Sequence, residues 1–145
     1  MAIDEVFSTG CCETAQGCVF AKALLARTAV CELAQRRSIG ERDLLECTSP
    51  AARIDCDALA DLLHERARFA LKLPPPSRPL THVQSLRLQC GGLAALRHEL
   101  APAEPDVHRL VGNAMARHGS FSDLPWGSLV AALAGWEPRR RARPR

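Results

Sequence analysis

The chain has 145 residues, a formal net charge of +3 and 47% hydrophobic residues. This length suits one domain, and the hydrophobic content excludes an intrinsically disordered chain. Aromatic residues make up only 4% and tyrosine is absent, whereas leucine and alanine are abundant, a composition that favours helices over strands. We therefore predict an all-α fold, a small irregular helical bundle.

The N-terminal residues MAIDEVFSTG carry acidic side chains where a secretory signal carries basic ones. The most apolar run, Val19 to Leu33, contains Lys22, Arg27 and Glu32, and these charges argue against a membrane span. We therefore expect a cytoplasmic protein. In a reducing compartment, an odd number of seven cysteines indicates metal ligands or reactive thiols rather than a disulfide framework.

Residues 13–37 are predicted to form the first helix, because helix-favouring residues dominate and no proline interrupts them. Apolar residues recur there at spacings of three and four, which is typical of one buried helical face. Ser38 and Gly40 should end this helix. A short segment from Glu41 to Cys47 follows.

Ser49 and Pro50 can serve as the N-cap and first position of a brief helical turn. The next helix is predicted to begin at Asp55 or Asp57 and to reach Leu73, because leucines form an amphipathic stripe along it. Residues 1–73 should therefore form a cysteine-rich helical region that binds a metal or cluster.

Residues 74–80 contain four prolines and cannot be helical, so we expect them to be a linker. The linker separates the cysteine-rich half from a basic half, in which residues 81–136 should be helical. Thr81 is predicted to cap a helix that is interrupted or kinked at Gly91-Gly92.

Two shorter helices are predicted near the C-terminus. One runs from Asp106 to His118 and is closed by Gly119. The other begins at Ser122 or Asp123 and reaches Leu133. Residues 137–145 should form a disordered tail rich in arginine.

Cysteine density is the feature of the sequence that points to a function. Six of the seven cysteines lie within one N-terminal stretch: Cys11, Cys12, Cys18, Cys31, Cys47 and Cys56. The chain has no C-x-x-C pair, which argues against zinc ribbons, bacterial ferredoxin motifs and thioredoxin-like redox motifs.

Helix geometry limits which thiols can share a site. On one unbroken helix Cys18 and Cys31 would lie about 20 Å apart, so they can share a site only if the helix starts late or breaks. A turn at residues 38–40 would bring Cys31 level with Cys47, and the loop that follows can return Cys56 to Cys47. These three cysteines are the predicted core of the site, with Cys11, Cys12 or Cys18 as the fourth ligand.

Four thiolates from helix ends and loops suit an iron–sulfur cluster or, as the alternative, a tetrahedral zinc ion. The irregular spacing favours the cluster, because a cubane is larger and accepts ligands from dispersed elements. The candidate ligands are Cys12, Cys18, Cys31, Cys47 and Cys56. We expect a role in electron transfer, redox sensing or the support of a metalloenzyme, with a redox protein or metalloenzyme as partner.

Other readings of the cysteines remain open. Cysteine also packs as a small apolar residue, which is what we expect for Cys90, and the adjacent thiols Cys11 and Cys12 suit reversible redox chemistry. The five histidines stand in no catalytic motif, so we do not expect an enzyme.

The C-terminus carries five arginines, at positions 139, 140, 141, 143 and 145. Such a tail can contact nucleic acid or an acidic protein through its charge. The alternative function is therefore a helical interaction or regulatory module with structural cysteines, which uses Arg139 to Arg145 for these contacts.

Overall fold

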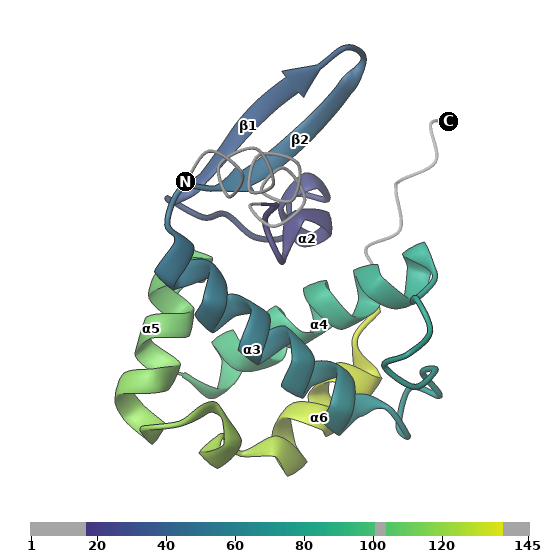
Figure 1. Cartoon of the computed structure of the whole chain (residues 1–145). Coiled ribbons are helices and arrows are strands. Elements are labelled where there is room, and N and C mark those ends of the chain that lie inside the picture. The colour runs from purple at the N-terminus through teal and green to yellow at the C-terminus, as the bar shows by residue number, and fades with distance from the viewer. Residues whose placement is uncertain (1–16, 101–103, 138–145) are drawn as a thin grey trace, which may run out of the picture.

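The computed structural model describes residues 17–100 and 104–137, and Figure 1 shows their arrangement. These residues form α2 (Ala21–Leu25), β1 (Ala34–Ile39), β2 (Arg42–Cys47), α3 (Pro50–Ala67), α4 (His82–Glu99), α5 (Val107–His118), the 3-10 helix η1 (Phe121–Asp123) and α6 (Trp126–Gly135). The prediction of an all-α fold is wrong, because the described residues contain five α-helices and a two-stranded antiparallel sheet. The sheet is a hairpin that projects from one end of the helical body (Figure 1).

The hairpin replaces the last four residues of the predicted first helix, Ala34 to Arg37. Its register runs from Ala34 opposite Cys47 to Ile39 opposite Arg42, and only two residues join the strands. The first of them, Gly40, has a φ of +62°, which a two-residue hairpin turn requires and which glycine adopts without strain. The turn and the pairing of the two strands therefore outweigh the helix propensity of the residues in β1.

Of the described residues of the predicted first helix, only the five of α2 are helical. α2 ends in a Schellman-type cap, in which the amide of Thr28 donates to Ala23 O at 3.1 Å and that of Arg27 donates to Leu24 O at 3.0 Å. Arg27 takes the left-handed conformation, with a φ of 61°. The chain consequently turns away from the helix axis well before Cys31.

α3 confirms the predicted cap but not the predicted break after it. The Ser49 side chain accepts a hydrogen bond from Ala52 N at 3.2 Å, and Pro50 occupies the first helical position. The helix then continues to Ala67 without interruption, so the separate start near Asp55 or Asp57 is wrong. Because α3 is continuous, the directions of its side chains relative to one another follow from helix geometry.

α4 is also continuous, so the predicted interruption at Gly91-Gly92 is wrong. Thr81 and Gln84 form a reciprocal capping box, which confirms the predicted helix start. The glycines serve close packing: a β-carbon on Gly92 would lie 2.8 Å from Leu63 Cδ1, and one on Gly91 would lie 3.3 Å from Trp136 Cβ. They let α4 approach α3 and the end of α6.

The predicted start and end of α5 are confirmed, whereas the last helix begins later than predicted. Asp106 caps α5 by accepting from Arg109 N at 3.1 Å, and Gly119 ends the helix with a φ of 75°. Residues 122 and 123 belong to η1, and α6 begins only at Trp126. The indole Nε1 of Trp126 donates to Phe121 O at 2.9 Å and so closes this turn.

One hydrophobic cluster joins residues from both sides of the proline-rich segment 74–80. Its largest fully buried side chains are Phe20, Leu59, Leu93, Leu110, Leu129, Leu133 and Cys90. The helices of the described ranges include none that is both long and apolar enough to cross a membrane. The hairpin stands outside this core, so the core begins where the hairpin meets α2 and α3.

Candidate functional site

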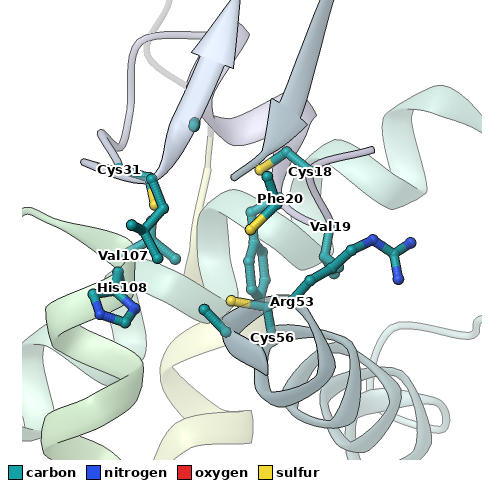
Figure 2. A pocket seen from close by; sticks show the side chains of 12 residues that line it. Cys18, Val19, Phe20, Cys31, Arg53, Cys56, Val107 and His108 are labelled. Carbon is teal, nitrogen blue, oxygen red and sulfur yellow. The ribbon is translucent and has the colours of Figure 1, made fainter. Parts of the chain in front are cut away.

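Four cysteines from four separate pieces of chain line one pocket, at the base of the hairpin. Cys18 precedes α2, Cys31 lies between α2 and β1, Cys47 ends β2, and Cys56 lies on α3. Figure 2 shows Cys31 on one side of the pocket, with the sulfurs of Cys18 and Cys56 pointing toward that side. The fold thus gathers thiols that are far apart in the sequence.

Backbone pairing to the hairpin places Cys18. Its amide donates to Leu45 O at 2.9 Å, and the preceding residue, Gly17, forms an antiparallel bridge with Glu46. Cys18 is therefore held beside β2, the strand that ends in Cys47.

Contacts with the start of α5 place Cys31. The amide of Val107 donates to Val30 O at 2.8 Å, and the Asp106 carboxylate accepts from Glu32 N at 2.6 Å. These two bonds flank Cys31 on either side along the chain. The loop that carries this thiol is thus fixed to the helical body.

Cys47 and Cys56 approach the pocket from the strand end and from α3. Cys47 lies opposite Ala34 in the hairpin, and its thiol donates to Ser49 O at 3.2 Å. Cys56 lies within the first half of α3, which begins only three residues after Cys47. The short connection thus brings both residues to the pocket.

Apolar side chains complete most of the wall. They are Val19, Phe20, Leu33, Ala34, Ala52 and Val107. The cavity between the lining side chains measures about 20 Å³, room for about one water molecule. The polar groups of the wall, besides the thiols, come from Arg53 and His108.

Burial and mutual repulsion keep two of these thiols protonated. Desolvation is the main cause that raises the pKa of Cys56 to about 12, and the negative charges that Cys31, Cys18 and Cys47 would carry raise it further. Desolvation also raises the pKa of the Cys18 thiol, with smaller contributions from Cys31 and Cys47. The four thiols are therefore close enough to influence one another electrostatically.

Across the two described ranges, no three Cys, His, Asp or Glu side chains stand close enough together to hold a metal ion. A tetrahedral zinc ion needs four sulfurs within about 2.3 Å of one point, which places them roughly 4 Å from one another. The thiols share a pocket without meeting at such a point.

The structure places most of the predicted ligands. The first helix breaks between Cys18 and Cys31, which is the condition under which the two can share a site. The predicted turn after Arg37 exists but is centred between Gly40 and Glu41, not at Ile39, so Ala34 rather than Cys31 lies opposite Cys47.

The remaining predictions concern residues away from the pocket. Cys90 is only 1% exposed and packs in the core, where its sulfur accepts a hydrogen bond from Thr28 Oγ1 at 3.2 Å. Cys11, Cys12 and the arginines from Arg139 to Arg145 lie outside the described residues.

Sequence reasoning missed two polar residues of the pocket wall. Arg53 precedes Cys56 by three positions, the spacing at which residues share a helix face, so a correct start for α3 would have revealed it. His108 reaches the pocket from α5, with its Nε2 4.0 Å from Glu32 Oε1, and no local pattern could have linked it to the cysteines.

Neither the family models, nor the curated proteins, nor the solved structures give a match to this chain.

Proposed function

We propose that the chain binds one iron–sulfur cluster through Cys18, Cys31, Cys47 and Cys56. Its role would be electron transfer, redox sensing or the support of a metalloenzyme. The observation that carries this proposal is the convergence of four cysteines from four elements on one mostly apolar pocket. An all-thiolate ligand set is the one that iron–sulfur clusters most often use.

The environment of the thiols supports metal binding over simple packing. Cys90 is fully buried in the core, as a packing cysteine usually is, whereas each of the four pocket cysteines stays partly exposed. Burial, and to a smaller extent the charges that the other pocket cysteines would carry, raises the pKa of Cys56 and Cys18 and makes their thiolate forms costly without a cation. A bound cation would remove that cost.

The spacing favours a cluster over zinc. The four thiols come from dispersed elements of the described chain, and a cluster, whose metal atoms are spread over a larger volume than a single ion, accepts ligands of that kind. Such a group needs more room than the cavity of about 20 Å³ gives, so the lining side chains would have to move apart when it binds. Apolar neighbours such as Phe20 and Val107 would limit contact of the group with water.

Four protein thiolates leave no open coordination position for a substrate. We therefore favour electron transfer or sensing over catalysis at the metal, with a redox protein or metalloenzyme as the partner. This proposal places the protein in the cytoplasm, where thiols stay reduced.

The test is anaerobic reconstitution of the full chain with iron and sulfide. We expect a brown protein with about four iron and four sulfide per chain, the content of one [4Fe–4S] cluster. The matched pair of variants is Cys56→Ser, which removes a pocket thiol, and Cys90→Ser, which removes a core thiol. Cys56→Ser should lose most of the colour, whereas Cys90→Ser should keep it.

Two outcomes would overturn the proposal. A wild-type chain that stays colourless and binds no iron rules out the cluster, and one that instead binds about one zinc ion supports the alternative cofactor. Equal cluster content in both variants would show that the pocket is not the binding site. Circular dichroism of each variant must match the wild type, so that loss of binding is not loss of folding.

A further inference from the structure

Arg53 joins the helix that carries Cys56 to the segment that carries Cys18. Its Nε donates to the carbonyl oxygen of Gly17, the residue before Cys18, at 2.9 Å. The side chain is half-buried and lines the thiol pocket. We propose that Arg53 is a positioning residue for the cluster site, an inference that rests on the proposed function.

The bond gives Cys18 a second anchor. The first anchor is the hydrogen bond from Cys18 N to Leu45 O, which fixes the residue to the hairpin. The hairpin projects from that body (Figure 1) and is built largely from its own strand pairing. Phe20, which is 1% exposed in the core, ties the segment to the helical body two residues after Cys18, and the Arg53 bond adds a direct tie between α3 and the residue before Cys18.

The direction of the side chain fits this role. In Figure 2 the guanidinium extends outward, away from the side of the pocket on which Cys31 lies. It therefore occupies no space between the sulfurs, while its Nε stays bonded to the carbonyl oxygen next to Cys18 and keeps a positive charge near that residue. Arg53 can thus hold a ligand in place and offset negative charge without acting as a ligand.

His108 on the opposite wall does not duplicate this function. Its Nε2 faces Glu32, which is also paired with Arg109 at 3.3 Å. Those contacts belong to the anchoring of Cys31 on α5. Removal of Arg53 should consequently affect Cys18 first and leave the Cys31 loop in place.

The first test uses the metal-free protein and measures amide hydrogen exchange at Cys18. Because Cys18 N donates to Leu45 O, its exchange rate reports how firmly this segment is held. In Arg53→Gln we expect exchange at Cys18 to become about tenfold faster, with unchanged exchange in α4. Arg53→Lys, which keeps a cationic donor, should restore most of the protection.

The matched control is Arg36→Gln on the hairpin. Arg36 is 63% exposed, and its NH1 lies 3.9 Å from Asp43 Oδ2, so this variant makes the same change of charge away from the Gly17 carbonyl. Exchange at Cys18 should be the same as in the wild type. An Arg53→Gln variant that also exchanges like the wild type would overturn the positioning role.

The second test uses reconstituted protein and measures how fast a chelator removes the iron, together with the reduction potential. Arg53→Gln should lose iron about tenfold faster. The loss of a nearby positive charge should also lower the equilibrium constant for one-electron reduction about tenfold, or about 59 mV. Arg53→Lys should recover the potential.

Iron loss and potential that both match the wild type in Arg53→Gln would overturn the inference, even if exchange at Cys18 rises. A wild-type chain that takes up no cluster would instead overturn the proposed function, and the exchange measurement would still decide whether Arg53 anchors Cys18. The two failures are therefore distinguishable. Equal circular dichroism and urea midpoints across the variants would show that each one is folded.

Discussion

Replacement of Gly92 by alanine tests the close packing of α4 against α3. The added β-carbon would lie 2.8 Å from Leu63 Cδ1 and 3.0 Å from Leu63 Cδ2, both well inside van der Waals contact. Leu63 is 4% exposed and belongs to the hydrophobic core, so its side chain cannot swing into solvent to make room. Either this leucine leaves its rotamer or the two helices move apart.

The magnitude follows from two opposing effects. Overpacking of a core by one methyl group costs about 1–3 kcal/mol. Replacement of a mid-helix glycine by alanine gains about 0.5–1 kcal/mol, because the unfolded chain loses conformational freedom. We therefore expect Gly92→Ala to lower the free energy of unfolding by up to about 2.5 kcal/mol.

Gly112 supplies the matched control on α5. It is exposed, and a β-carbon there would meet nothing within 4 Å, so Gly112→Ala should raise the free energy of unfolding by about 0.5–1 kcal/mol. Urea unfolding followed by circular dichroism measures both variants. In a Leu63→Val background, which shortens the opposing side chain, Gly92→Ala should cost less. Equal stability of the two alanine variants in the wild-type background would refute the packing argument.

Two further predictions concern Cys56 and Lys72. The pKa of Cys56 is raised in the folded chain, so the neutral thiol stabilises the fold below the ordinary thiol pKa of 9.0, and this stability is lost as the pH rises toward about 12. Urea unfolding between these pH values should show a steeper loss for wild type than for Cys56→Ala, and parallel curves would contradict the burial of this thiol. Lys72 has a φ of 54° in the cap that follows α3, where glycine is the favoured residue. Lys72→Gly should therefore raise the urea midpoint by the equivalent of about 0.5–1 kcal/mol, whereas Lys22→Gly, within α2, should lower it.

The parts of the fold that could be predicted are those with short-range signals. Thr81 with Gln84, Asp106 and Gly119 each satisfy backbone groups within three or four residues, so their effect can be read directly from the sequence. Ser49 with Pro50 gave the start of α3 in the same way. No such local rule determines whether a segment between two helix caps forms a strand and pairs with another segment of the chain.

The hairpin could not be predicted for this reason. Arg36 and Arg37 have good helix propensity, and β1 is largely exposed and shows no alternation of apolar and polar residues. Cross-strand contacts, such as that of Arg37 NH1 with Glu46 Oε1 at 3.1 Å, stabilise the strand instead. Only Gly40 marked the turn, and it is equally compatible with a helix end.

The candidate site was predicted in part. Cys31, Cys47 and Cys56 were grouped because a turn was expected between the first two, and the structure brings these three and Cys18 to one pocket. The exact register was missed, since it depends on which two residues form the turn. The contribution of α5, through Val107 and His108, depends on tertiary contacts that leave no trace in local sequence.

The four pocket cysteines lie on successive segments of the chain between residues 18 and 56. A group that bonds to all of them would act as a covalent staple, since it would tie the start of α2, both ends of the hairpin and α3 into closed loops. Such loops restrict the unfolded chain far more than the folded one, as disulfides do in small secreted domains. Ligation would then decide whether the projecting hairpin is a loose appendage or a rigid extension of the helical body.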